Sequence, residues 1–289
     1  MTVGLKKYWA TSLGGQGRLV AMALPAMAVF GLFFILPLTV VMKEAFQGGG
    51  VEFSRIFRDP IFLKGLRGTL LLGTLTPGFS LVVGFLVSWH LSTLPEKIRT
   101  TILFWISLPL TFSGLIVAYG FILAFGRAGF VTLSLEHLGI SSAAVAGFLY
   151  SPMGLGFAYS YYLIPRVVLM MLPVLVNFDR TQIITAETLG AGRARAFFDI
   201  LIPQVFPAAV AAYCLVAAVA IGAYGTALAL VGTQVNILPL QLYSKISGTG
   251  TDFPGAAAMS VILMAMCCLV IGAGEIYAVK KEDHFQCGI

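Results

Sequence analysis

Arg166 is a charged residue that lies well inside an apolar stretch of this sequence, so it is a candidate for binding a solute there. An arginine within a membrane span usually faces the bundle interior or a water-filled cavity. It could steer an anionic solute along a path, and Tyr162 at i−4 could share its helix face. It could equally bind backbone carbonyls at a kink made by Pro165, or pair with Glu275 as a tie between helices. The residue types leave both interpretations open.

Tyr224 is the other candidate for a path-lining side chain. It lies between Gly222 and Gly225 in a second apolar stretch. A bulky tyrosine among small residues could act as a gate, but glycines at this spacing also allow helices to pack closely. The pattern therefore permits a functional and a purely structural interpretation.

The remaining reactive residue types are scattered. The cysteines are Cys214, Cys267, Cys268 and Cys287, and they follow neither metal-ligand nor disulfide spacing. The histidines are His90, His137 and His284, and they are too far apart in sequence to indicate a metal site. No clustered acids or nucleophile–base pair occurs within the apolar stretches. The sequence predicts no catalytic residue, no metal site and no bound cofactor.

The composition is that of a membrane protein. The 289 residues are 58% hydrophobic and only 10% charged, whereas soluble domains are about one quarter charged. The mean hydropathy is +0.94. The net charge of +6 fits basic residues that flank spans and does not indicate a nucleic-acid partner.

The apolar runs predict an all-α, polytopic protein with six transmembrane helices, since one span needs roughly 20 apolar residues. The expected spans are 19–42, 66–91, 101–125, 143–176, 205–231 and 254–279. Together they form one membrane domain, 19–279, between an N-terminal segment, 1–18, and a tail, 280–289. Pro165 and Pro173 predict kinks in the fourth span.

An even number of spans puts both termini on one side of the membrane. With the termini in the cytoplasm, ten Lys and Arg residues fall on the inner side and seven on the outer side. Cytoplasmic loops carry the excess of positive charge. The charge distribution therefore predicts a multi-pass membrane protein with both termini inside.

A polar segment, 177–204, separates the fourth and fifth spans. Asp179 is expected to cap a helix over 180–189, with Gln182 as its reciprocal partner. Gly190 stands where a left-handed residue would end that helix, and a second helix is expected to start near Gly192. Ile183, Ile184 and Ala186 give the first helix apolar residues outside the spans. It could dock another protein or lie flat on the membrane surface.

This segment resembles the cytoplasmic EAA loop of ABC-importer permeases, whose pattern is E-A-A, three residues, Gly, nine residues, Ile, any residue, Leu, Pro. Gly190, Ile200 and Pro203 match in type and spacing, and Ile202 replaces the leucine. The family's E-A-A falls on Ile184, Thr185 and Ala186, so its glutamate is missing. Glu187 lies about one turn further on and is expected to supply that charge. Segments 107–129 and 236–246 resemble the spermidine/putrescine group.

The resemblance implies the type I ABC-importer permease fold and a set of partners. The chain lacks the G-x-x-x-x-G-K-[ST] phosphate loop, so ATP and magnesium are expected on two copies of a separate ATPase. The coupling residues would be Ile184, Thr185, Ala186, Glu187, Leu189, Gly190, Ile200 and Pro203. A second permease, expected to be a different chain, and a periplasmic or extracellular solute-binding protein would complete the importer in the lipid bilayer of the bacterial plasma (inner) membrane.

The implied function is a non-catalytic permease subunit for a small polar solute, polyamine-like or 2-aminoethylphosphonate-like. The alternative is a secondary transporter or channel that works without ATP. Such a carrier is expected to show coupling-ion acids or paired broken helices, and the apolar stretches contain few acids. An intramembrane enzyme would need clustered catalytic side chains.

Overall fold

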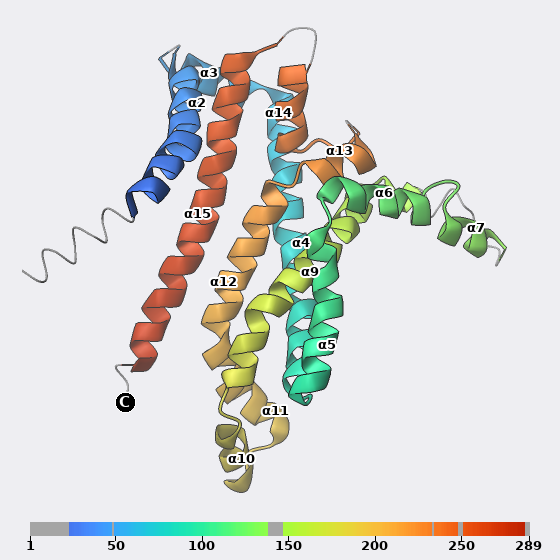
Figure 1. The fold of residues 1–289 in the computed structure, drawn as a ribbon, viewed down its shortest axis with the longest axis vertical. Helices are drawn as coiled ribbons and strands as arrows, with labels where there is room; N and C mark the ends of the chain where they lie inside the picture. Colours follow the sequence, from blue (N-terminus) through green and yellow to red (C-terminus); the bar gives the residue numbers. More distant parts are fainter. Residues whose placement is uncertain (1–22, 48, 138–146, 233, 248–250, 287–289) are drawn as a thin grey trace, which may run out of the picture.

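The computed structural model describes residues 23–47, 49–137, 147–232, 234–247 and 251–286, with side chains as far as residue 280. Every regular element within these ranges is helical, which confirms the predicted all-α class (Figure 1). The predicted segment 1–18, the first residues of the first and fourth predicted spans, and the end of the tail lie outside the described residues.

The helices follow one another along the chain with short connections. In order they are η1 (Gly31–Ile35), α2 (Leu36–Phe46), α3 (Val51–Arg58), α4 (Pro60–Ser92), α5 (Glu96–Ser107), η2 (Leu108–Thr111), α6 (Gly114–Phe125), α7 (Phe130–Glu136), α9 (Pro152–Asn177), α10 (Thr181–Thr188), α11 (Arg193–Ala196), η3 (Phe197–Leu201), α12 (Ile202–Ile221), α13 (Gly225–Val231), α14 (Leu238–Ser247) and α15 (Phe253–Gln286).

Within the described residues, six helical segments are long and apolar enough to cross a membrane, in agreement with the predicted number. They are Ala23–Phe46, Pro60–Ser92, Gly114–Glu136, Pro152–Asn177, Arg193–Ile221 and Phe253–Lys280. The fourth begins at Pro152, later than predicted, because the Ser151 hydroxyl accepts a hydrogen bond from the Gly154 amide at 3.2 Å and caps the helix there.

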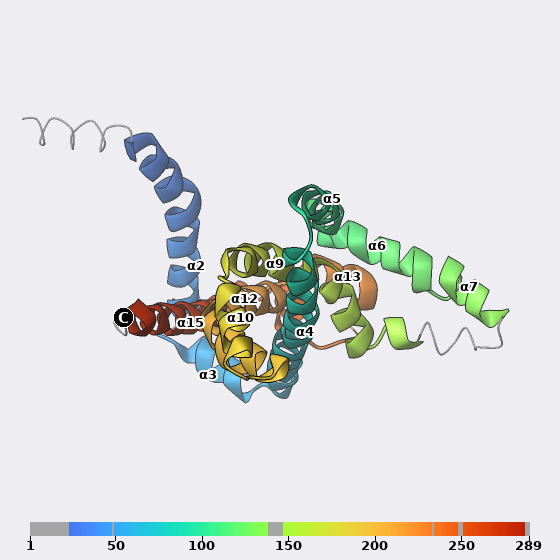
Figure 2. The ribbon, with the colours of Figure 1, turned by 90° about the horizontal axis from the view of Figure 1, so that it is seen from below.

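The predicted third span, 101–125, is not one helix. α5 ends at Ser107 and gives way to the 3₁₀ turn η2, and α6 starts afresh at Gly114. Pro109 lies in that turn and cannot continue an α-helical ladder. Ser113 then caps α6, accepting from the Ile116 amide at 3.5 Å. Beyond this break α6 and α7 leave the bundle sideways (Figures 1 and 2).

The predicted fifth span, 205–231, is also broken. α12 ends at Ile221, and α13 starts at Gly225 after three non-helical residues. The prediction of a continuous span was wrong because alanine-rich apolar sequence continues through both helices and hides the interruption. The start of α13 packs against the start of α6, so the two helix breaks lie close together.

The core is built where α4, α9 and α12 cross (Figure 2). Small residues bring these helices together: a Cβ on Gly84 would overlap Val167, and one on Gly73 would overlap Ile221. Such close approach stabilises helix pairs in lipid through van der Waals contact. α15 packs on α12, and α2 packs on α15 at the periphery.

The bundle has two distinct ends (Figure 1). α10 and α11 form one end. α3 and α14 lie at the other, where the buried amide of Leu238 donates to Thr69 Oγ1 on α4 at 2.8 Å. The long helix α4 connects the two ends. A movement at one end of the bundle can therefore be transmitted to the other end through α4.

Candidate functional site

The polar segment between α9 and α12 folds as two short helices with a glycine corner, as predicted. α10 spans Thr181–Thr188, and Gly190 follows with a φ of +92°. The Gly190 amide donates to Glu187 O and the Ala191 amide to Ala186 O, each at 3.0 Å. These two bonds form a Schellman ending. Gly190 thus sets the direction in which the chain leaves α10.

The start of α10 differs from the predicted capping box. Asp179 Oδ1 accepts from the Thr181 amide at 2.9 Å, and the Thr181 hydroxyl and amide hold the pKa of Asp179 below its usual value. The Gln182 backbone amide donates to Asp179 O at 3.4 Å, but within the described residues the Gln182 side chain does not reach back to Asp179. Its Oε1 instead accepts from Gln204 Nε2 at 2.6 Å, which links α10 to the start of α12.

The apolar residues of α10 divide between two faces. Ile183 packs against the main core, so it anchors the helix and is not part of an exposed surface. Ile184 is 58% exposed, and Leu189, at the corner, is 84% exposed. Thr185 is exposed and Ala186 half-buried. The structure therefore leaves Ile184 and Leu189 as the apolar contacts available to a partner.

Glu187 faces the second short helix. Its Oε1 lies 3.6 Å from Arg193 Nε, and the Arg193 side chain is 93% exposed. A solvent-exposed pair of this kind contributes about 1 kcal/mol or less. Glu187 therefore remains able to interact with another chain, although Arg193 competes for it.

The returning limb enters the bundle through a π-turn. In η3 the Ile202 amide bonds to Phe197 O, five residues back. Pro203 follows, and its ring would clash with the carbonyl of residue 199 in a regular α-helix. Leu201 is fully buried, whereas Ile200 and Pro203 are half-buried. Ile200 and Pro203 thus lie where the short helices join α12.

A second group of candidate residues lies where α9 meets the break between α12 and α13. The buried Tyr159 hydroxyl donates to Ala223 O at 2.9 Å. Tyr162 lies beside Thr226, and the Arg166 guanidinium lies within electrostatic range of its hydroxyl. Residues i, i+3 and i+7 of a helix lie on nearly one face. The structure brings together Tyr162 and Arg166 as predicted and adds Tyr159.

Arg166 is half-buried in α9. In the described part of the chain it forms no ion pair, with Glu275 or any other carboxylate, and no hydrogen bond to a backbone carbonyl. Glu275 is exposed on α15. The structural interpretation of Arg166 as a tie to Glu275 is therefore wrong. The guanidinium is left free to meet an anionic group.

Tyr224 lies in the break itself, directly before α13. Its ring centroid is 5.2 Å from that of Tyr243 on α14. The side chain therefore reaches toward the end of the bundle formed by α3 and α14, away from Arg166. The predicted close packing around its glycines does occur, but between the starts of α13 and α6: a Cβ on Gly225 would lie 3.6 Å from the Leu115 amide nitrogen.

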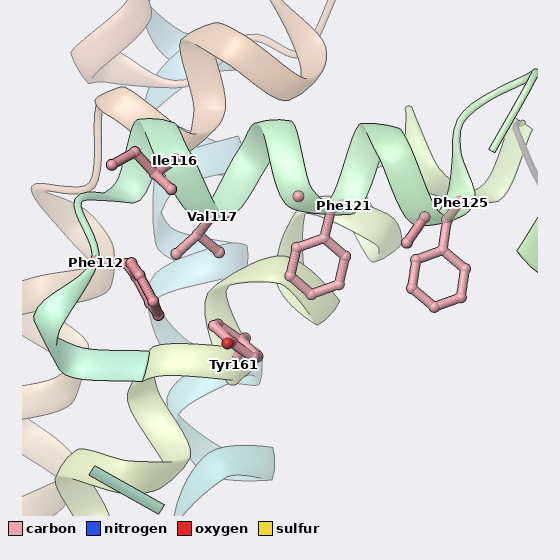
Figure 3. Close-up of a pocket in the computed structure, with 8 residues that line it drawn as sticks. Phe112, Ile116, Val117, Phe121, Phe125 and Tyr161 are labelled. Carbon is pink, nitrogen blue, oxygen red and sulfur yellow. The ribbon is translucent and has the colours of Figure 1, made fainter. Parts of the chain in front are cut away.

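Two recesses flank α9 on other faces. One, of about 320 Å³, lies beneath α6 and is lined by aromatic and aliphatic side chains with the Tyr161 hydroxyl at its floor (Figure 3). The other, of about 930 Å³, lies between α4 and α9 near residues 234–236. Its polar residues include Thr76, Ser160, Gln234 and Asn236. The sequence carried no signal for either, since distant helices form both.

The described residues contain no cluster of His, Cys, Asp or Glu with the geometry of a metal site. What the arrangement offers is a helix tip with exposed apolar residues at one end, and an arginine with hydroxyl groups inside the bundle. The first suits docking and the second suits passage of a polar or anionic molecule.

Comparison with known proteins identifies relatives of the whole domain. Residues 78–278 match the family described as binding-protein-dependent transport system inner membrane component. The chain is 27% identical to the spermidine/putrescine transport system permease protein PotB of Salmonella typhimurium, covering 74% of each chain. It is 28% identical to the putative 2-aminoethylphosphonate transport system permease protein PhnU of Salmonella typhi, covering 78% of this chain and 80% of that one.

A third relative is sulfate permease 2, chloroplastic, of Chlamydomonas reinhardtii, at 26% identity over 83% of this chain; this chain spans only 64% of that protein. Among solved structures, a chain of a bacterial alginate ABC transporter, in complex with an alginate pentasaccharide-bound periplasmic protein, superposes with a TM-score of 0.75. The likeness covers 91% of this chain and 94% of that chain at 18% identity, which supports the fold.

The family match covers well over half of the chain, and the six apolar helices agree with it. Members of the family are membrane components without catalytic residues of their own. The chain thus belongs to the binding-protein-dependent transport system inner membrane components, as a non-catalytic permease subunit of an ABC importer.

Proposed function

We propose that α10 is the contact through which a separate ATPase drives this permease. The supporting observation is the geometry of the helix tip. α10 lies at one extreme of the molecule (Figure 1), and it exposes Ile184 and Leu189 there. Exposed apolar residues that rest on an anchored helix are typical of a protein-docking surface. Thr185, Ala186 and Glu187 complete this surface.

The importer would contain two ATPase copies, which bind ATP and magnesium, and a second, different permease. A periplasmic or extracellular solute-binding protein would deliver the solute. ATP draws the two ATPases together, and α10 and α11 move with them as short levers. The two permeases then switch between inward-open and outward-open arrangements, which is a two-state change biased by nucleotide.

Affinity purification of the full chain from its native membrane tests this proposal. The expected result is a complex that contains the ATPase, and loss of the ATPase when Ile184 and Leu189 are both changed to Ser. The matched control is Leu123→Ser on α6, which is also highly exposed but lies far from α10. A chain that purifies alone and transports solute without ATP would contradict the proposal and favour the secondary-transporter alternative.

The solute we propose is a small polar molecule with an anionic group, of the 2-aminoethylphosphonate kind. The observation that favours it over a polyamine is Arg166, which meets no carboxylate in the described part of the chain. A guanidinium binds phosphonate or carboxylate oxygens through paired hydrogen bonds and would repel a polycation. Tyr162 and Thr226 add hydroxyl groups beside it, and we propose that Tyr224, which points toward α14, lies on the solute path beyond Arg166.

Uptake by the assembled importer distinguishes the two solute classes. 2-Aminoethylphosphonate is expected to enter and spermidine is not. Arg166→Gln should abolish that uptake, and Arg166→Lys should retain part of it because the charge remains. Spermidine uptake that survives Arg166→Gln would contradict the anionic assignment but not the role of α10.

A further inference from the structure

We infer that Arg180 and Trp89 form a clasp that transmits movement of α10 to α4, and that Arg180 is a positioning residue for coupling. This inference rests on the proposed contact between α10 and the ATPase. It concerns what happens on the permease side of that contact, where the helix tip must act on the spans.

The clasp joins both limbs of the polar segment to the end of α4. Arg180, directly before α10, donates from Nη2 to Ser92 Oγ at 2.8 Å. Its guanidinium carbon lies 5.3 Å from the Trp89 ring centroid. On the returning limb, Phe197 meets the same indole edge to face, with ring centroids 5.4 Å apart. One side chain of α4 therefore contacts the segment before α10 and the segment after α11.

These contacts are specific in geometry. A planar guanidinium can stack on an indole and donate to a hydroxyl at the same time, whereas an ammonium acts as a point charge. Ser92 is itself oriented, because its hydroxyl also donates to Trp89 O at 2.7 Å. Trp89, Ser92, Arg180 and Phe197 are all half-buried, so water competes only partly for these interactions.

α4 can carry the movement across the molecule. It is one helix from Pro60 to Ser92, with Pro77 inside it, and it spans about 50 Å at 1.5 Å per residue. Pro77 removes one backbone hydrogen bond of the ladder, but the helix continues on both sides of it. At its far end it is tied to the α14 region: Gln241 Nε2 donates to Ile61 O at 2.6 Å, and Thr69 accepts from Leu238. A Cβ on Gly68 would overlap Asn236 O, so this region packs directly on α4.

The test uses the complete importer with its ATPase, with the native cysteines changed to alanine and Ser244→Cys on α14 as a reporter. A maleimide reagent labels that cysteine with and without ATP plus vanadate. With the clasp intact, nucleotide should change the labelling rate. Arg180→Gln and Trp89→Leu should lose the change while ATP hydrolysis continues, and Trp89→Phe should retain it. Arg195→Gln, an exposed arginine of the same segment, is the matched control.

A variant that only weakens folding would lower ATP hydrolysis and the labelling response together, so their separation identifies a coupling role. An unchanged response in Arg180→Gln and Trp89→Leu would overturn the clasp. If the labelling rate of Ser244→Cys does not respond to nucleotide even with Arg180 and Trp89 unchanged, the clasp is also overturned. The proposed α10 contact with the ATPase would still stand in that case. A complex that lacks the ATPase altogether would overturn both.

Discussion

At the scale of single residues, Gly190 has a conformation that is readily adopted only because glycine has no Cβ. Its φ of +92° costs an L-residue about 1 kcal/mol or more, although the space around it is open. Gly190→Val is expected to turn α10 out of position, leaving the chain in the membrane but abolishing uptake. Gly192 also has open space but a φ of −69°, so Gly192→Val should transport normally. Equal uptake by both variants would refute the lever role.

Glu187 has two possible partners, and paired variants separate them. If Glu187 contacts the ATPase, Glu187→Gln should reduce solute-coupled ATP hydrolysis, whereas Arg193→Gln should not. If its purpose is only the 3.6 Å ion pair with Arg193, both variants should have the same small effect, under about 1 kcal/mol. The measurement is the rate of ATP hydrolysis in the reconstituted importer. The same rate in Glu187→Gln and Arg193→Gln would contradict the hypothesis that Glu187 replaces the missing EAA glutamate.

At the scale of elements, the break between α12 and α13 depends on α9. The Ala223 carbonyl has no helical partner and accepts from the Tyr159 hydroxyl. A buried acceptor left unsatisfied costs about 1–3 kcal/mol. Tyr159→Phe is therefore expected to lower the thermal stability of the purified protein. Tyr161→Phe removes a hydroxyl from a 41% exposed residue two positions further along α9 and should have little effect. The opposite order of stabilities would contradict this assignment.

The ion pair between Lys245 of α14 and Asp252, directly before α15, predicts a pH dependence. Lys245 Nζ lies 2.9 Å from Asp252 Oδ2, and the Gly255 amide donates to Oδ1 at 3.0 Å. The bond from Lys245, together with the Gly255 amide and the charge of Arg55, lowers the pKa of Asp252. A lowered pKa stabilises the folded state above the unfolded value of about 3.9 and loses that effect as the pH falls through the folded value.

Asp252→Asn should therefore unfold at a lower temperature than the parent at pH 7, and the difference should shrink as the pH falls below about 4. Thermal unfolding across this range measures it. Glu52→Gln, which breaks the exposed pair with Arg55, serves as the control and should change stability little. A difference between Asp252→Asn and the parent that persists in acid would contradict the assigned cause.

At the scale of the whole molecule, the two ends of the bundle should lie on opposite sides of the membrane. We propose that α10 faces the cytoplasm, which puts both termini inside. In a chain without native cysteines, Thr188→Cys at the α10 tip should react only with reagent on the cytoplasmic side. Ser54→Cys on α3 should react only from outside; both positions are exposed. Labelling of both from one side would contradict this orientation.

The sequence by itself determined the features that depend on local composition and spacing. Apolar length predicted six membrane helices, and Gly190 with its flanking residues predicted the corner after α10 and the start of α11. The resemblance of 177–204 to the EAA loop predicted the family. These features are read from neighbouring residues, so no knowledge of distant contacts was needed.

Only the tertiary structure decided the breaks in the third and fifth predicted spans, because apolar sequence continues through them and the compensating partners come from other helices. At the break between α12 and α13, the Ala223 carbonyl accepts a hydrogen bond from Tyr159 of α9, which is 64 residues away in sequence. The tertiary structure likewise decided that Arg166 lacks Glu275 as a partner. It also decided that the Gln182 side chain pairs with Gln204 and not with Asp179. Whether two polar groups meet depends on helix packing, which hydrophobic periodicity does not encode.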